Sequence, residues 1–107
     1  MEPLLSQGKF VILKHKDKGP LHFDLILEGQ DLCPTFQFEQ KELLMGIRIN
    51  DHRKVYLTFE GLISPEKGTV TQFDHGDFTF TNNNLLKKKK KKYSFLIDTD
   101  NSLFKKN

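Results

Sequence analysis

Residues 10–28 read FVILKHKDKGPLHFDLILE, and the fold is decided by this stretch. Two runs rich in Val, Ile, Leu and Phe flank a short segment in which Gly19 and Pro20 break regular structure. Branched and aromatic residues favour strands, and Gly and Pro together favour turns. The pattern therefore predicts an antiparallel β-hairpin with strands at about residues 9–15 and 22–28.

Three metal-competent side chains lie at the mouth of this hairpin. If His15 and His22 face each other, the period of two along a strand puts both on the same face as Asp24. Opposed β-carbons are about 5 Å apart, within reach of one ion. Imidazoles suit Mn, Fe or Zn, and a carboxylate favours a hydrolytic ion such as Mn or Zn. The alternatives are a one-residue slip that turns His15 away, and histidines that are only exposed polar residues at strand ends.

The opposite face of the same two strands is also apolar. It carries Phe10, Ile12, Phe23, Leu25 and Leu27. Strands that are apolar on both faces need cover on both sides. We therefore expect an all-β fold, a small closed or nearly closed antiparallel β-barrel with at most one short helix.

The rest of the chain continues in short alternating segments. Residues 1–8 are expected to be a loose arm, and 9–107 a single domain. Residues 40–46 are the helical candidate, ending at Gly46. Strands are expected at residues 35–39, 47–50, 53–61 and 93–98, in a hairpin with its turn at 75–76, and in a last short strand with a frayed tail within 99–107.

Composition restricts the class of protein. The chain has 107 residues and one cysteine, Cys33, so it forms no internal disulfide. It shows neither the opening of a secretory signal nor a segment long enough to span a membrane. We expect a cytoplasmic monomer that does not bind membranes.

The positive charge is concentrated in one tract. Residues 87–107 hold eight Lys and two Asp, a net +6, so the first 86 residues are net −3 within the overall +3. The run at 87–92 has two interpretations, a solvated loop or a basic contact to a nucleic-acid backbone. Under the second interpretation its nucleic-acid-binding residues are Lys87, Lys88, Lys89 and Lys90.

Four ordered motifs resemble one known family. FVILKH, LHFDLILEG, DHRKVYLTFEG and GTVTQFDHGDF, in this order and at these intervals, resemble the 3′-phosphoesterase domain of bacterial DNA ligase D. This domain also occurs as small stand-alone proteins, and the similarity covers roughly residues 9–80. The resemblance implies a compact β-barrel that uses Mn or a related ion, with Zn and Co as further options.

The resemblance also implies roles for individual residues. The metal ligands fall on His15, His22 and Asp24, the same set that hairpin geometry groups on one face. The family's phosphate-handling residues fall on His52 and Tyr56, which are four apart in the motif DHxxxY. A histidine there can protonate a leaving group, and a phenol can donate to a phosphate oxygen. The alternatives are an exposed loop histidine and a strand tyrosine with its hydroxyl in water.

The sequence departs from the family at one important place. Ligase-linked members read HxDxR, and their Arg binds phosphate, whereas this chain has Ile26 there. An aliphatic side chain supplies no charge-assisted contact. The family's arm also brings a His and an Arg, which residues 1–8 lack. Substitutes for the missing guanidinium are Arg48, Arg53 and Lys14.

Three functional hypotheses follow. The first is a metal-dependent phosphoesterase of DNA repair that removes a 3′-phosphate or a 3′-ribonucleoside from DNA or RNA ends, working beside a separate ligase or polymerase. The second is a catalytically weak or inactive module with the same barrel that binds nucleic-acid ends or a protein partner. The third is a small β domain whose histidines are surface residues.

Overall fold

The structure is a computed structural model that describes residues 1–81, 84–87, 93–97 and 102–106. No helix in these ranges is long and apolar enough to cross a membrane. The expectation of an all-β fold is confirmed. Its elements are β1 Gln7–Lys16, β2 His22–Leu27, β3 Cys33–Phe38, β4 Met45–His52, the 3-10 helix η1 Lys54–Leu57, β5 Gly61–Ser64, β6 Gly68–Thr81, β7 Asn84–Lys87, β8 Ser94–Ile97 and β9 Leu103–Lys106.

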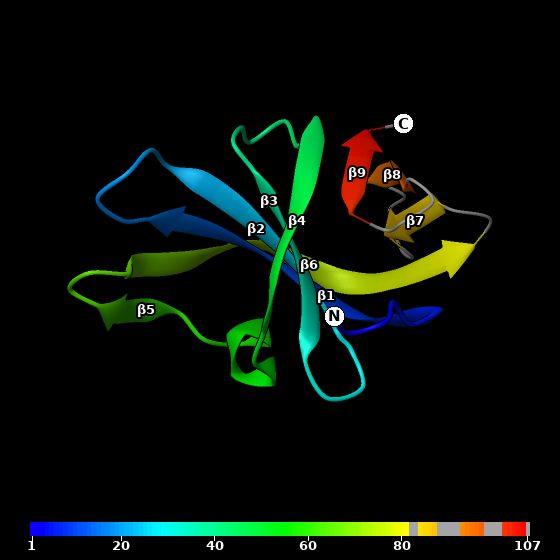
Figure 1. Ribbon diagram of the computed structural model, residues 1–107, viewed down its shortest axis with the longest axis horizontal. Helices are drawn as coiled ribbons and strands as arrows, with labels where there is room; N and C mark the ends of the chain where they lie inside the picture. Colours follow the sequence, from blue (N-terminus) through cyan, green and yellow to red (C-terminus); the bar gives the residue numbers. More distant parts are fainter. Residues whose placement is uncertain (82–83, 88–92, 98–101, 107) are drawn as a thin grey trace.

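All strand pairs are antiparallel and belong to one sheet (Figure 1). The order is β1-β2-β3-β4-β9-β8-β7-β6-β5, and β1 also pairs with β6. The β1–β6 ladder is long, running from Gln7 opposite Thr79 to Lys16 opposite Thr69. From Phe10 to His15, β1 therefore has a paired neighbour on each side, β2 on one and β6 on the other.

The hairpin has the register expected from the sequence. His15 lies opposite His22, and Leu13 lies opposite Asp24. Directly opposed residues share a face of the sheet, so His15, Leu13, His22 and Asp24 point to the same side. The opposite side carries the alternate residues of the same strands, for example Leu25.

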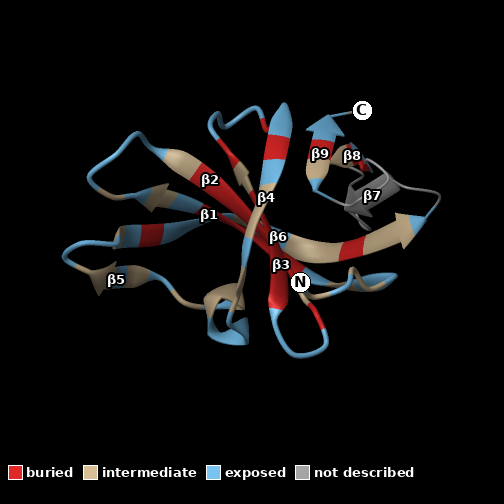
Figure 2. Cartoon of the chain, in the orientation of Figure 1, coloured by how far each residue is buried: buried red, intermediate tan, exposed pale blue. Residues whose placement is uncertain are grey.

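The phenylalanine core, as we call the larger buried cluster, covers one face of the sheet. Seven of its twelve buried residues are Phe, and Phe36 stacks on Phe104 with ring centroids 3.6 Å apart. Figure 2 shows the buried segments gathered where β1, β2, β3 and β6 cross. The members of this core are Phe10, Ile12, Phe23, Leu25, Leu27, Phe36, Phe38, Leu43, Phe78, Phe95, Ile97 and Phe104.

The small core covers the other face. Val11, Leu13, Ile26, Cys33 and Val70 are buried there, and Tyr56, Leu57, Phe59 and Ile63 pack against them. These four come from the segment that holds η1 and β5. The continuous strand expected at residues 53–61 is therefore wrong. The alternation of apolar residues was misleading, because consecutive residues of a tight helical turn, not every second one, contact the strands below.

The helix expected at residues 40–46 is also wrong, because the chain turns there instead. Leu43 has a φ of 54° and is buried in the phenylalanine core. Gly46 lies in β4, opposite Phe38. A Cβ at Gly46 would meet the Phe38 ring at 2.3 Å, so this glycine allows a ring to lie over the strand and does not end a helix.

The hairpin expected around residues 75–76 is a third correction. β6 runs through both residues without a turn, since Phe10 pairs with Gly76 and Val11 with His75. Pairing along β1 keeps this stretch extended. This ladder has one register shift, where Ile12 pairs with Asp74 and Leu13 with Gln72, so that Phe73 on β6 has no partner on β1.

The N-terminal arm is held in place, contrary to expectation. The Glu2 N–H donates to Asp51 Oδ2 at 2.7 Å, and its carboxylate accepts from the Leu32 N–H at 3.0 Å. Leu4 and Leu5 pack against the phenylalanine core. The arm thus covers one end of that core. The lysine run lies mostly outside the described residues.

Candidate functional site

Two histidines and a buried aspartate meet at the end of the β1–β2 hairpin. His15 Nδ1 is 3.3 Å from Asp24 Oδ2, and His22 Nε2 is 3.6 Å from the same oxygen. The two imidazole rings are 4.5 Å apart at their centroids. The structure thus brings the residues predicted as metal ligands, His15, His22 and Asp24, around one oxygen atom.

A backbone carbonyl lies behind each imidazole. His15 Nε2 lies 2.6 Å from the Lys67 carbonyl oxygen, and His22 Nδ1 lies 3.4 Å from that of Pro20. A carbonyl oxygen only accepts, so a neutral ring that donates to it presents the lone pair of its other nitrogen toward Asp24. In these tautomers three acceptors converge. In the other tautomer, His15 Nδ1 donates to Asp24 Oδ2 at 3.3 Å and its Nε2 faces the carbonyl without a hydrogen.

Such an arrangement needs a proton or a cation among the three acceptors. Asp24 is 2% exposed, and its Oδ1 has no hydrogen-bond partner within the described part of the chain. The Asp24 carboxylate raises the pKa of His22 above its ordinary value, although burial acts in the opposite direction. In the metal-free protein a proton on His22 thus relieves part of the repulsion.

The donor set also fits a divalent ion in its dimensions. Nitrogen and oxygen ligands lie about 2.0 to 2.2 Å from zinc, so two ligands at a tetrahedral angle are about 3.4 Å apart. The observed separations are 3.3 Å from His15 and 3.6 Å from His22 to Asp24. The carbonyls behind the rings are the kind of outer contact that orients metal-ligating histidines.

Asp17, which the sequence analysis did not single out, forms a group with the two histidines. One donor atom on each of His15, Asp17 and His22 lies within 4.8 Å of the others. The sequence did hold a signal, since His15 and Asp17 repeat the H-x-D spacing of His22 and Asp24. Asp17 falls in the hairpin loop, where alternation along a strand is a weaker guide.

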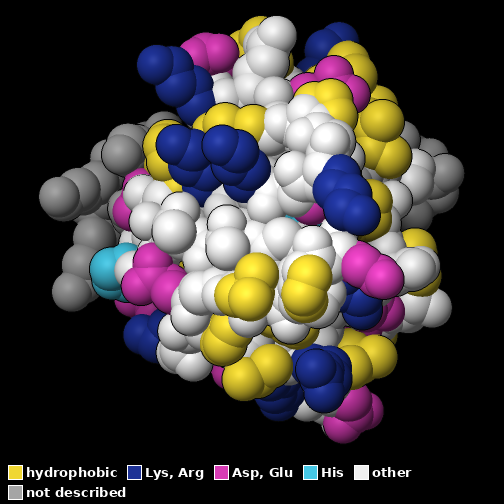
Figure 3. Space-filling model, turned by 90° about the vertical axis from the view of Figure 1, so that its left-hand side faces the viewer, with side chains coloured by type: hydrophobic (Ala, Val, Ile, Leu, Met, Phe, Trp, Pro, Cys, Tyr) yellow, Lys and Arg dark blue, Asp and Glu magenta, His cyan; other side chains and the backbone are white. Residues whose placement is uncertain are grey.

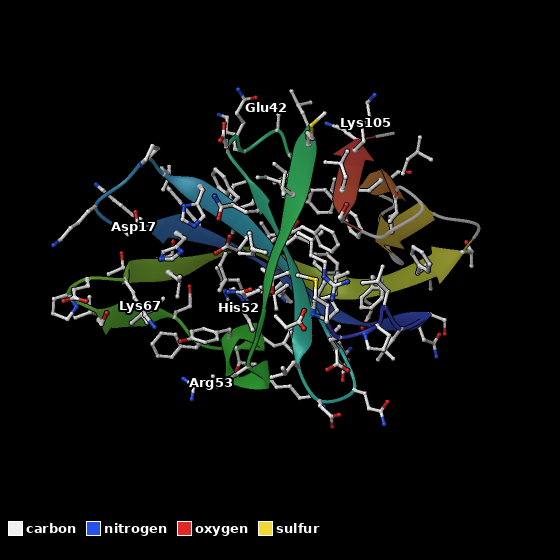
Figure 4. All side chains as sticks on the ribbon, viewed as in Figure 1. Asp17, Glu42, His52, Arg53, Lys67 and Lys105 are labelled. Carbon is white, nitrogen blue, oxygen red and sulfur yellow. The ribbon has the colours of Figure 1, made fainter. Side chains whose placement is uncertain are left out.

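A cleft of about 530 Å³ opens beside these residues. It includes the residues predicted for phosphate handling as well as most of the histidine and aspartate group. Figure 4 shows Asp17, Lys67, His52 and Arg53 on the side of the β1–β2 and β5–β6 turns, with Glu42 and Lys105 elsewhere. The lining is Leu13, His15, Asp17, Asp24, Asp51, His52, Arg53, Tyr56, Ile63, Glu66, Lys67 and Val70.

His52 and Tyr56 stand together on one wall of the cleft. Their rings are 5.6 Å apart at the centroids in an edge-on arrangement. His52 lies at the end of β4, and its Nδ1 donates to the Asn50 carbonyl at 2.9 Å. His52 Nε2 is then the nitrogen available to another group. Tyr56 is held by Phe59, 5.9 Å away edge-on, above the small core.

Arg53 reaches the cleft and Arg48 does not. The Arg53 guanidinium lies over the Tyr56 ring at 5.9 Å, on the cleft wall. The Arg48 side chain is 6% exposed, bonded to the Glu2 carbonyl and to Asp51 Oδ1 at 3.0 Å. Burial alone would raise the pKa of Asp51, but its bonds to Glu2 and Arg48 lower it overall. Arg48 thus ties the arm to β4, away from the site predicted for it.

Other candidate residues lie outside the cleft. Ile26 lies on the same face of β2 as His22 and Asp24, but it is fully buried in the small core and does not line the cleft. Lys14 is exposed but does not line the cleft. The side chain of Lys87 and all of Lys88, Lys89 and Lys90 lie outside the described residues. On the described part of the face in Figure 3, cationic and anionic side chains form separate small groups, not one basic patch.

The turn between β5 and β6 sets the position of the Lys67 carbonyl. The Lys67 N–H donates to Ser64 Oγ at 2.9 Å, and Gly68 has a φ of 80°. A Cβ at Gly68 would lie 2.0 Å from the Lys16 carbonyl oxygen, so only glycine lets this turn approach β1. Gly68 therefore allows the contact that orients His15.

Comparisons with known proteins leave the functional argument to this geometry. No protein-family model matches the sequence, and no curated protein matches it.

Proposed function

We propose that this protein is a divalent-metal-dependent phosphoesterase that processes 3′ ends of nucleic acid, with Mn as the first candidate ion. The observation that supports it best is the approach of two imidazole nitrogens, one on His15 and one on His22, to a single oxygen of the buried Asp24 carboxylate. His15 and Asp24 of this set line a cleft that also holds His52 and Tyr56. Two of the three proposed cation ligands thus share one cavity with the proposed phosphate-binding groups.

Each residue of the site has a proposed role in binding the cation or the phosphate. His15, His22 and Asp24 hold the cation, which when bound would polarise a phosphate oxygen and lower the pKa of an attacking water. The Tyr56 hydroxyl donates to a phosphate oxygen. The Arg53 guanidinium, held over the Tyr56 ring, supplies charge that Ile26 does not.

His52 is the proposed proton donor. Its Nδ1 hydrogen is committed to the Asn50 carbonyl, which fixes the ring and leaves Nε2 toward other partners. A proton on Nε2 can pass to the leaving oxygen as the P–O bond breaks, after which the ring is neutral. The same imidazole can then take a proton from water for the next cycle.

The proposed relationship is to the 3′-phosphoesterase domain of bacterial DNA ligase D, and the proposed context is DNA repair. The β1–β6 pairing supports closure of the sheet into a small barrel of the kind that this resemblance implies. The substrates proposed are DNA or RNA ends that carry a 3′-phosphate or a 3′-ribonucleoside. A separate ligase or polymerase would use the trimmed end.

The second candidate is a module that binds such ends without efficient catalysis. Ile26 in the small core favours it, because a buried aliphatic side chain supplies no charge-assisted contact to a phosphate in the cleft. Under this alternative Arg53 contributes to binding only. The two candidates differ in whether a bound end is hydrolysed.

The test is release of inorganic phosphate from a primer–template with a 3′-phosphate, with and without Mn. We expect release to require Mn and to fall by at least about a hundredfold in His22→Ala and His52→Ala, since each removes a group acting at the reacting phosphate. His75→Ala is the matched control, because His75 is exposed on β6, pairs with Val11 and lies outside the cleft.

Three results would count against the proposal. If the folded wild type binds Mn and the 3′-phosphate end but releases no phosphate, the binding module is the better account. If His75→Ala loses as much activity as His52→Ala, the cleft is not the site of reaction. Phosphate release without added metal after treatment with chelator would remove the role given to the histidines of the hairpin.

A further inference from the structure

Asp17 is a fixed carboxylate, not a freely solvated one. It follows the last residue of β1 and lies in the hairpin loop. Its Oδ1 accepts the Gly19 N–H at 2.7 Å, and the side chain is half-buried on the cleft wall. A side chain held by its own loop needs little further ordering to bind a ligand.

This carboxylate approaches the same two imidazoles that Asp24 approaches. One donor atom on each of His15, Asp17 and His22 lies within 4.8 Å of the others. Two carboxylates of different burial thus flank one pair of rings, since Asp24 is buried and Asp17 is half-exposed.

The chain reaches this arrangement by using one spacing twice. H-x-D occurs at His15 and Asp17 on leaving β1, and again at His22 and Asp24 on entering β2. Residues two apart on an extended strand point to the same face, so Asp24 on β2 lies on the side of the hairpin that carries the rings. Asp17 lies one residue beyond the end of β1, and the distances between donor atoms place it beside the same rings.

We propose that Asp17 is a fourth protein ligand of the divalent cation, on the cleft side of the site. The proposal rests on the function proposed above, because it concerns the same cation. Two neutral imidazoles and two carboxylates carry a charge of −2, which balances a divalent ion. Asp24 provides the buried ligand and Asp17 the accessible one.

The second carboxylate has a consequence for the choice of metal. Carboxylate oxygens suit Mn and Mg, whereas imidazole-rich sets suit Zn and Cu. With Asp17 the set has equal numbers of nitrogen and oxygen donors. Without it, the set shifts toward nitrogen and its charge no longer balances that of the ion. Loss of Asp17 should therefore weaken Mn more than Zn.

The experiment is a titration of the full-length, metal-stripped protein with Mn and, separately, with Zn by isothermal calorimetry. Asp17→Asn removes the charge but keeps an Oδ1 acceptor for the Gly19 N–H, so the loop should be preserved. We expect the Mn dissociation constant to rise about 10- to 100-fold, and that for Zn to rise less. Glu66→Gln is the matched control, since it removes a charge from the same cleft outside the histidine group.

The outcomes separate this proposal from the proposed function. If the wild type binds Mn, Asp24→Asn abolishes binding and Asp17→Asn binds like the wild type, Asp17 is not a ligand while the cation site stands. If Glu66→Gln weakens Mn as much as Asp17→Asn does, the effect is that of the general field and the proposal is overturned. A wild type that binds no Mn overturns both the ligand role and the metal-dependent function.

Discussion

The two faces of the β1–β2 hairpin carry the same kinds of strand residue but differ in what covers them. One face is closed by the phenylalanine core, in which rings such as Phe36 and Phe104 stack directly. The other is only partly covered, by η1 and β5 over the small core, and it ends in imidazoles and carboxylates. Neighbouring residues of one strand therefore serve stability on one side and chemistry on the other.

The difference shows where a small protein can keep an unsatisfied polar group. Asp24 Oδ1 is buried without a hydrogen-bond partner in the described part of the chain, which is costly in an apolar site. The phenylalanine core is built from apolar residues alone. That core stabilises a fold in which the other face holds converging acceptors. The changes below should therefore affect stability on one face and metal binding on the other.

The largest effect is expected in the phenylalanine core. Phe36→Ala removes a fully buried ring and should lower the free energy of unfolding by about 3 to 5 kcal/mol. Denaturant unfolding measures this loss, and Mn affinity of the remaining folded protein should be unchanged. Ile47→Ala, at a 60% exposed position on β4, is the control and should cost less than about 0.5 kcal/mol. A loss of Mn affinity in Phe36→Ala alone would contradict the separation of the two faces.

The next largest effect is expected at Gly68, which couples stability to the site. Gly68→Ala places a Cβ against the Lys16 backbone at a positive φ, so the β5–β6 turn must shift. We expect a loss of about 2 kcal/mol or more, together with weaker Mn binding, because the Lys67 carbonyl no longer orients His15.

Gly61→Ala provides the control for Gly68→Ala. Gly61 also has a positive φ, 126°, but a Cβ there would meet only Phe59, at 3.8 Å. It should lose stability from backbone strain while keeping Mn affinity. Equal losses of Mn affinity in the two variants would show that the carbonyl contact is not what matters.

At Asp24 we expect a small effect on stability and a large effect on Mn binding, the reverse of the effects expected in the phenylalanine core. Asp24→Asn in metal-free protein at pH 8 should change the free energy of unfolding by less than about 1 kcal/mol, or raise it, because it removes a buried and incompletely paired charge. Mn binding should be lost. Unfolding in the presence of chelator and calorimetric titration measure the two quantities. A destabilisation above about 3 kcal/mol would instead identify Asp24 as part of a structural ion pair.

The smallest effect that we expect is a dependence of the protein's stability on pH, caused by protonation of His22. The pKa of His22 is raised by Asp24 from its ordinary 6.5, so its protonated form stabilises the folded, metal-free protein. That stabilisation is complete below pH 6.5 and is lost as pH rises through the higher folded-state pKa. The midpoint of thermal unfolding should therefore fall more from pH 6 to pH 8 in the wild type than in His22→Gln. His75→Gln should retain the wild-type slope, and a flat wild-type profile would refute this role of the proton.

The hairpin and its site were predictable because alternation and opposition fix most of the geometry. Once His15 faces His22, the position of Asp24 follows from the period of two. Asp17 repeats the same spacing but lies in the loop beyond β1, where the period of two no longer fixes the direction of a side chain. Its proximity to the rings becomes evident only in three dimensions.

The segments that were not predictable depend on contacts distant in sequence. Gly46 reads as a helix end until Phe38 is seen to lie over it from β3. The segment around Tyr56 reads as an alternating strand until the small core beneath it is known. Arg48 reads as a surface cation until Glu2 and Asp51 are seen to enclose it. In each case the deciding contact is with a residue that is distant in sequence, so the local sequence does not show it.

The central claim is that the hairpin end holds a divalent cation. The most direct measurement is anomalous diffraction at the manganese absorption edge from crystals of the full chain soaked in Mn. The account predicts one strong peak bounded by His15, His22 and Asp24, with Asp17 on its cleft side. No peak in well-soaked crystals, or a peak only at other acidic residues such as Asp74 and Asp77, would contradict the claim.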